Sequence, residues 1–266
     1  MGIKTKITRT QLPKKYQNYK LLPTTNGVMA SVYLLDDVYV LKLFEKDTSV
    51  LTIESEIKLL NKLKNLAVPK VVDRFQIDGY EVIIYTQVKG EIHFEASIND
   101  VKEIGKFLKE FHAQSKDIQL ESKQLFQKDR LIKLIKSTGE KRLKKHYNLI
   151  NLTLENDGAI HGDLFPDNCK FMGKELSGVY DFSDACLGDF HFELAVVTVA
   201  WCFDNNKLNM KKGKALFEAY KPTRNTNNFM EYVKYALLYY ATTRFIAGHD
   251  YEELLVRLES LKICKI

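Results

Sequence analysis

The chain reads HGDLFPDN at residues 161–168 and VYDFSD at residues 179–184, and these two stretches decide its fold. Both follow apolar, strand-like runs and bring polar residues into turn-forming positions. Asp163, Asn168 and Asp181 supply two carboxylates and an amide, and Mg²⁺ prefers such oxygen ligands, taking few from protein and the rest from phosphates and water. We therefore expect Asn168 and Asp181 to bind Mg²⁺ beside a phosphate. Asp163 is then free to orient an attacking hydroxyl or to accept its proton.

The order of these residues resembles the protein kinases, in which Asp-x-x-x-x-Asn is followed by a metal-binding Asp. Here Gly162 stands between His161 and Asp163, where protein kinases have arginine. This His-Gly-Asp variant resembles the aminoglycoside phosphotransferase and choline kinase family, over nearly the whole chain. The resemblance implies an α+β, two-lobed protein-kinase-like fold, with a small N-terminal antiparallel β-sheet lobe carrying one helix and a larger, mainly helical C-terminal lobe. It also implies that His161 braces the catalytic loop.

The first ninety residues carry the signals of such a sheet lobe. Two β-branched and aromatic runs, 31–35 and 38–44, are joined by a pair of aspartates and predict a hairpin. An amphipathic helix follows and must end before Pro69. Two further strands, 70–76 and 80–87, then turn at Asp78-Gly79.

After Gly90 the pattern becomes helical. An apolar stripe from Val101 to Phe111 predicts a helix with Asn99 or Asp100 as its cap. Residues 122–150 predict helix with a strongly basic face, which is either a solvated surface or a contact for an anionic partner. Short strands are expected at 159–181 and helices from residue 190 onward. We expect residues 1–90 to form the nucleotide-binding lobe and residues 91–266 the catalytic and substrate-binding lobe.

The resemblance implies two nucleotide-binding side chains in the first lobe. Lys42, on the second strand of the hairpin, would hold the phosphates, and Glu56 on the following helix would fix that lysine. Glu54 is the rival of Glu56, which fits the family's Glu-x-x-x-Leu-x-x-Leu spacing better.

Main-chain groups complete the expected nucleotide site. The loop at residues 24–31 occupies the place of a phosphate-covering loop, in which amides near Gly27 and the hydroxyl of Ser31 could bind phosphate oxygens. Gln87 and Val88 lie at the joint between the lobes, where the family hydrogen-bonds adenine through the main chain.

Composition excludes several classes of protein. The 266 residues include 40 Lys+Arg and 34 Asp+Glu, a net charge of +6, and 45% are hydrophobic, which is enough to bury a core. The longest apolar stretch, 194–203, is about half of the ~20 residues that a membrane-spanning helix needs. The four cysteines form no Cys-x-x-Cys pair and no apolar secretory core follows the basic N-terminus, so we expect a cytoplasmic protein without a membrane partner.

The resemblance implies an enzyme that uses ATP and Mg²⁺ to phosphorylate the hydroxyl of a small-molecule alcohol. The stretches LSGVYDFSDAC at 176–186 and WCF at 201–203 resemble the homoserine kinases of this fold. The chain departs from that group at Glu193, where Asp is usual, and at Val199-Ala200, where Asn-Asp is usual. Homoserine or a similar amino-alcohol is the first expectation. Choline, ethanolamine, a sugar or an aminoglycoside are the alternatives.

The charges of a zwitterionic amino acid call for one cation and one anion in the acceptor site. Arg244 and Asp184 are available, but Asp184, Asp204 or Tyr239 would equally suit a cationic acceptor.

Two other classes remain at this stage. The first is a pseudokinase that keeps the fold without turnover. The second is a nucleic-acid binder that uses the basic residues 128–145, which lack accompanying aromatic side chains. We expect no nucleic-acid partner.

Overall fold

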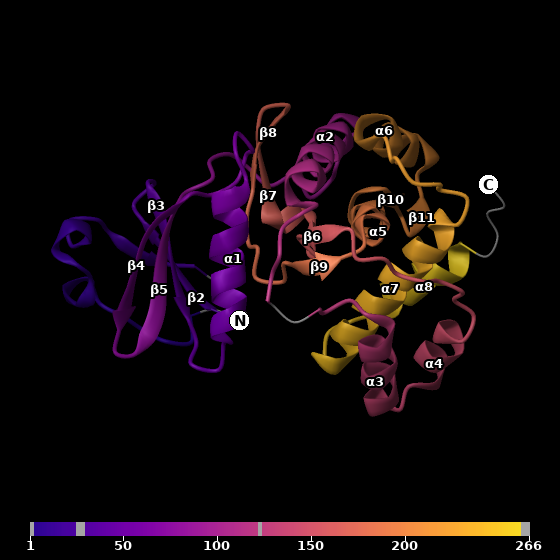
Figure 1. Cartoon of the computed structure of the whole chain (residues 1–266), viewed down its shortest axis with the longest axis horizontal. Coiled ribbons are helices and arrows are strands. Elements are labelled where there is room, and N and C mark those ends of the chain that lie inside the picture. The colour runs from indigo at the N-terminus through magenta and orange to yellow at the C-terminus, as the bar shows by residue number, and fades with distance from the viewer. Residues whose placement is uncertain (1–2, 25–29, 122–123, 262–266) are drawn as a thin grey trace.

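The computed structural model describes residues 3–24, 30–121 and 124–261 (Figure 1). Its N-terminal part is a five-stranded antiparallel sheet in the order β1-β2-β3-β5-β4. One helix, α1 (Val50–Lys62), lies beside this sheet on the side of the helical part of the molecule. The strands are β1 (Leu21–Pro23), β2 (Ala30–Leu35), β3 (Tyr39–Phe44), β4 (Val71–Ile77) and β5 (Tyr80–Thr86).

The two faces of this sheet bury different residues, because successive side chains of a strand point to opposite faces. Leu41 and Leu43 of β3 and the facing residues of β5 form an outer cluster. That cluster is covered by Leu12, Tyr16 and other residues of the N-terminal segment, which forms two short 3₁₀ turns, Arg9–Gln11 and Lys14–Tyr16. The N-terminal segment is therefore the outer layer of the sheet.

The inner face belongs to the main core. Ile53 and Leu59 of α1, together with Ile83 of β5, lie in one hydrophobic cluster with residues of the helical part. Lys42 alternates with Leu41 and Leu43, so its side chain points to this inner face, toward the second half of the chain.

The second half of the chain is mainly helical. Helix α2 packs against α6, and α7 packs against α3, α5 and α8. The helices are α2 (Ile98–Ser115), α3 (Lys128–Thr138), α4 (Lys141–Tyr147), α5 (Phe190–Trp201), α6 (Met210–Tyr220), α7 (Phe229–Ile246) and α8 (Glu252–Ser260). Short strand pairs interrupt them: β6 (Gly158–Ile160) with β9 (Cys186–Gly188), β7 (Cys169–Met172) with β8 (Glu175–Val179), and β10 (Phe203–Asp204) with β11 (Lys207–Leu208).

The expected α+β, kinase-like fold is confirmed, with the hairpin, the helix and the two further strands within one to three residues of their expected positions. Two details differ. The N-cap of α2 is Ser97, whose hydroxyl accepts from Asp100 N while the Asp100 carboxylate accepts from Ser97 N. Gly139, with φ +69°, divides the expected basic helical stretch into α3 and α4. None of the helices in the described ranges has the length and apolar character needed to cross a membrane.

Candidate active site

The HGDLFPDN stretch forms a loop between β6 and β7. Its sharp turn depends on Gly162, whose φ of +80° is a conformation that favours glycine. A Cβ atom at Gly162 would also lie 2.5 Å from the ring of Phe126, so no other residue fits without movement. The amide nitrogen of Asn168 donates to both the main-chain oxygen and the carboxylate of Asp163, at 2.8 and 2.9 Å. These bonds fix the Asp163 side chain within the loop.

A buried carboxylate anchors the HGDLFPDN loop, which is called the catalytic loop below. Glu193 of α5 accepts from the main-chain nitrogens of His161 and Gly162, at 2.6 and 2.9 Å. Its other oxygen lies 2.7 Å from Nε2 of His112, and Tyr220 hydrogen-bonds the second ring nitrogen of that histidine. In the sequence, Glu193 is notable only as a departure from the homoserine kinases. The structure assigns it to anchoring the loop.

His161 braces the same loop from inside. Its Nδ1 accepts from the main-chain nitrogen of Asp163 at 3.2 Å, and its Nε2 lies 3.1 Å from the carbonyl of Tyr180. Burial lowers the pKa of His161, so the neutral ring is favoured. The ring therefore links the catalytic loop to the segment that carries Asp181.

Lys42 joins the sheet to that segment. Its ammonium donates to both carboxylate oxygens of Glu56 at 3.0 Å, and also to Asp181 at 3.2 Å and Ser183 at 2.7 Å. Burial lowers the pKa of Lys42, but the carboxylates of Glu56 and Asp181 outweigh this effect and raise it. The ammonium therefore stays charged at neutral pH.

The rival residue, Glu54, lies elsewhere. It forms a salt bridge of 2.6 Å with Arg74 on the exposed side of α1. Tyr85 donates to Glu56, which supports Glu56 as the partner of Lys42.

Asp181 and Asn168 have the donor atoms that suit Mg²⁺. The Asp181 side chain is 52% exposed; desolvation by neighbouring atoms acts to raise its pKa, but Lys42 and the Ser183 hydroxyl outweigh this and lower the pKa to about 2, so the carboxylate is ionised. Because the amide nitrogen of Asn168 is turned to Asp163, its Oδ1 oxygen is the atom left for a ligand. In the described ranges no three His, Cys, Asp or Glu side chains form a metal cluster, and Mg²⁺ bound beside phosphates needs no such cluster.

Asp163 has the opposite electrostatic environment. Burial raises its pKa to about 7, and the negative charges of Asp184, Asp167 and Asp181 act in the same direction. A carboxyl with this pKa exchanges protons near neutral pH, as a group that receives a proton from a hydroxyl should.

The structure gives no support to the expected phosphate contacts of the loop at residues 24–31. Gly27 lies outside the described residues. The Ser31 hydroxyl is buried, accepts from the main-chain nitrogens of Lys4 and Thr5, and donates to Glu45. These bonds occupy the hydroxyl inside the sheet lobe, so the structure gives no support to Ser31 as a phosphate ligand.

At the joint between the lobes, two of the main-chain groups expected to bind adenine are hydrogen-bonded within the chain. The main-chain nitrogen of Gln87 donates to Val38 at 3.1 Å, and the carbonyl of Val88 accepts from the Lys170 ammonium at 3.2 Å. Of the expected adenine contacts, the remaining main-chain groups are the carbonyl of Gln87 and the nitrogen of Val88. The Val88 side chain packs over Gly178.

Two residues of this site were not anticipated. Ser183 donates to Asp181 at 2.6 Å and accepts from Lys42, and its place two residues after Asp181 was the available signal. Tyr240 of α7 donates to the carbonyl of Gly162, a contact that no local sequence pattern indicates. Asp204, a candidate for binding a cationic acceptor, instead pairs with Lys212 and Asn209.

Lys42 from the sheet and Asp181 from the helical half are in direct contact, at 3.2 Å, and a lysine and an aspartate brought together in this way are typical of kinase-like phosphotransferases. Sequence comparison agrees with that class. The model of the phosphotransferase enzyme family, APH, matches residues 20–224, and the chain belongs to this family.

Individual proteins of known name or structure also resemble this chain. A homoserine kinase of Methylocella silvestris is 28% identical over 256 residues, which cover 84% of this chain and 79% of the relative. Among solved structures, the GDP and kanamycin complex of APH(2")-IIIa has a TM-score of 0.65 at 16% identity and covers 91% of this chain and 92% of that chain. The streptomycin–ATP–APH(2")-IIa complex has a TM-score of 0.60 at 20% identity, with coverage of 95% and 93%. These structures establish the fold.

Proposed function

We propose that this enzyme transfers the γ-phosphoryl group of ATP to the side-chain hydroxyl of homoserine or a closely similar amino-alcohol. The observation that carries the reaction type is the contact of Lys42 with both Glu56 and Asp181 beside the Asp163–Asn168 pair. The acceptor follows from the homoserine kinase that resembles this chain over most of both sequences. The aminoglycoside kinases are similar at only 16–20% identity and support the fold alone.

Each residue has a separate task in the proposed reaction. Lys42, held by Glu56, binds α- and β-phosphate oxygens, and Asn168 and Asp181 hold Mg²⁺. The metal supplies positive charge that neutralises the phosphates during transfer. Asp163 orients the acceptor hydroxyl toward the γ-phosphorus and takes its proton. Catalysis is then mainly positioning and electrostatic stabilisation.

We also propose that the lobes divide near Gly90. Its φ is +106°, and a Cβ there would lie 2.2 Å from the carbonyl oxygen of Phe171. Glu91 and Phe171 exchange two main-chain hydrogen bonds directly after this glycine. A close backbone crossing at this point supports a joint between residues 1–90 and 91–266.

An acceptor panel tests the proposed activity. Phosphorylated product is measured with Mg-ATP and homoserine, choline, ethanolamine, an N-acetylhexosamine or an aminoglycoside. We expect homoserine to give the highest kcat/KM. If Mg-ATP raises the Tm but no acceptor yields product, the chain is a nucleotide-binding pseudokinase and the proposal is wrong.

The role of Asp163 has a matched control in the same loop. Asp163→Asn should lower kcat by roughly a hundredfold to ten-thousandfold, the usual contribution of a general base. Asp167→Asn removes the same charge from an exposed side chain and should stay within a few-fold of the parent enzyme. Wild-type turnover in Asp163→Asn would rule out the assigned role.

A further inference from the structure

A second aspartate, Asp184, lies near Asp163, the residue proposed to orient the hydroxyl of the acceptor. Asp184 follows Asp181 by three residues, and its main-chain oxygen lies 3.2 Å from the position of a Cβ on Gly162. Asp184 is thus adjacent to the catalytic loop. After burial, it is the largest cause of the raised pKa of Asp163, which means that the two carboxylates are close to each other.

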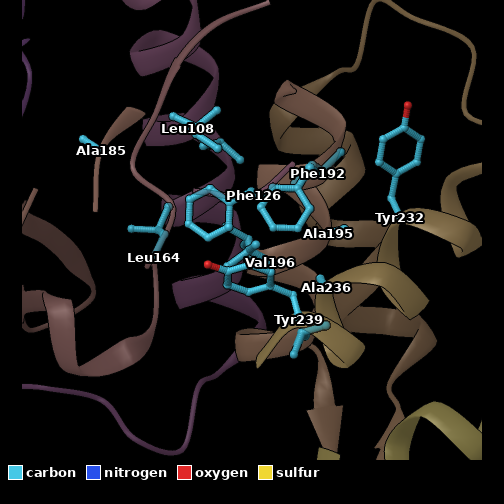
Figure 2. Packing of buried hydrophobic residues seen from close by; sticks show 14 of the residues in the cluster. Leu108, Phe126, Leu164, Ala185, Phe192, Ala195, Val196, Tyr232, Ala236 and Tyr239 are labelled. Atoms are coloured by element: carbon cyan, nitrogen blue, oxygen red, sulfur yellow. The ribbon is translucent and has the colours of Figure 1, made fainter. Parts of the chain in front are cut away.

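The segment before α3 brings a cation to the same region. The Phe126 ring lies over Gly162 and packs 4.8 Å from Tyr239 of α7 and 5.0 Å from Phe192 of α5, between centroids. Figure 2 shows Phe126 between Leu164 of the catalytic loop and Phe192, with Tyr239 close by. Tyr235 anchors the segment further by donating to the Phe126 carbonyl at 2.7 Å.

Arg130 lies in the first turn of α3, one turn beyond this anchored phenylalanine, and it is exposed. The positive charge of Arg130 affects the pKa of three groups, two in the stretch 184–186 and one on α7. Burial raises the pKa of Asp184, of Cys186 and of Tyr239, and the guanidinium of Arg130 counteracts this in each case, through a hydrogen bond as well in Tyr239. The Arg130 guanidinium therefore lies near Tyr239 and the stretch from Asp184 to Cys186.

Asp184 is thus near both Asp163 and Arg130. Within the described parts of the chain, neither Asp184 nor Arg130 forms a salt bridge. Both charges are thus available to a ligand whose hydroxyl is at Asp163. A guanidinium suits a carboxylate, which it can bind through two parallel hydrogen bonds.

We propose that Asp184 and Arg130 read the two charges of the acceptor, Asp184 binding its ammonium group and Arg130 its carboxylate. The site then selects a zwitterionic amino-alcohol over choline, ethanolamine and sugars. This inference rests on the proposed kinase function and assigns the cation to Arg130 instead of Arg244. It also explains selectivity physically, because an alcohol that lacks one charge leaves a charged side chain of the site without its partner.

Three alcohols distinguish the proposed contact of Asp184 with the ammonium group from that of Arg130 with the carboxylate. Homoserine carries both charges, 3-aminopropan-1-ol lacks the carboxylate, and 4-hydroxybutyrate lacks the ammonium. Arg130→Met should raise KM for homoserine about ten- to hundredfold, the value of a hydrogen bond to a charged group, with little change in kcat. The same variant should leave kcat/KM for 3-aminopropan-1-ol within about threefold of the parent enzyme.

The complementary variant and the control use the same assay. Asp184→Asn should reduce the preference for homoserine over 4-hydroxybutyrate, and Arg130→Lys should recover part of the homoserine KM. Lys136→Met removes a charge from an exposed position of the same helix and should change none of these values. The KM for ATP, measured alongside, should be unchanged in Arg130→Met.

The outcomes distinguish this inference from the function on which it rests. If the parent enzyme phosphorylates homoserine but Arg130→Met keeps its KM and selectivity, the recognition pair is wrong and the kinase proposal stands. Equal losses with all three alcohols would show that Arg130 is only structural, which also overturns the inference. If the parent enzyme phosphorylates other alcohols but not homoserine, both proposals are wrong.

Discussion

The pKa of Asp163 lies above that of an ordinary aspartate, because its half-buried side chain is desolvated and lies near other carboxylates. Its pKa of about 7 lies above that of the unfolded chain, so the ionised form, which accepts the substrate proton, is lost as the pH falls through that value. We expect kcat/KM for the acceptor to decline on acidification with an apparent pKa at or below about 7, since bound Mg²⁺ favours the carboxylate. A pH–rate profile in saturating Mg-ATP measures this.

Asp184→Asn provides the internal comparison for this pH profile. It removes a negative charge that raises the pKa of Asp163, so the acid limb should move to lower pH whatever happens to its height. An acid limb that moves to higher pH, or does not move, would contradict the assignment of this titration to Asp163.

Gly162 and Gly173 allow a conformational cost to be separated from a steric one. Both have positive φ, +80° and +61°, so an alanine at either position costs about 1–2 kcal/mol of stability. Only at Gly162 would the new Cβ also meet the Phe126 ring, while nothing lies within 4 Å at Gly173. Gly162→Ala should lose most activity and more stability than Gly173→Ala, by turnover and denaturant unfolding. Equal effects would show that the Phe126 contact is unimportant.

The family resemblance predicted individual residues well where the family's motifs define a role. It implied roles for Lys42 and Glu56 beside Asp181, and the structure brings these three residues into contact. Arg130 was missed because only the folded chain brings it near Asp184. Ser31 shows the converse: its position before Lys42 suggested a phosphate ligand, but Glu45 and the N-terminal segment occupy its hydroxyl.

Among the elements, the N-terminal segment makes a stability contribution that can be measured by substitution. Leu12 is 3% exposed in the cluster on the outer face of the sheet, whereas Leu22 of β1 is 49% exposed. Leu12→Ala should lower the free energy of unfolding by about 2–5 kcal/mol, from lost burial and the cavity left behind. Leu22→Ala, the same change at the surface, should stay within about 0.5 kcal/mol. Urea unfolding checks both, and similar small effects would contradict the assigned layer.

The sequence predicted elements wherever one periodicity ran over several residues, as in the strands on either side of Asp78-Gly79. It left residues 3–19 unassigned, because this segment has neither period and is held by contacts with distant strands. The division of the basic stretch at Gly139 has a local cause, a left-handed helix end, which the single glycine could have indicated.

At the scale of the whole molecule, the ion pair of Lys42 and Asp181 is one of the contacts that link the two halves of the chain. Mg-ATP should bind between these halves and raise the free energy of unfolding by about 2.7 kcal/mol at a hundred times its Kd. Asp181→Asn should remove the part of this stabilisation that depends on Mg²⁺, while Asp167→Asn should keep it. Thermal unfolding with ATP, in Mg²⁺ or EDTA, makes the comparison. An undiminished Mg²⁺ effect in Asp181→Asn would exclude Asp181 as a ligand.

The overall fold was predictable from the order of motifs, because an N-terminal Lys–Glu pair and a downstream Asp–Asn loop belong to one architecture. The identity of the acceptor was not, since it depends on side chains that α3, α7 and the catalytic loop bring together. The basic residues near Lys141 illustrate the same point. Of these, Arg142 forms a salt bridge of 2.5 Å with Glu252 of α8, a contact within the chain that no local pattern announced.

The two faces of the sheet also differ in when they can form during synthesis. The outer cluster is made entirely from residues 7–84, so it can assemble once the first lobe has left the ribosome. The buried face of α1 shares its cluster with α2, α5 and α7, and these are translated later. While the later helices are still missing, Ile53 and Leu59 have only the sheet residues of their cluster, such as Ile83 and Tyr85, to pack against. The first lobe is therefore complete on its outer face before the inner face of α1 has all of its partners.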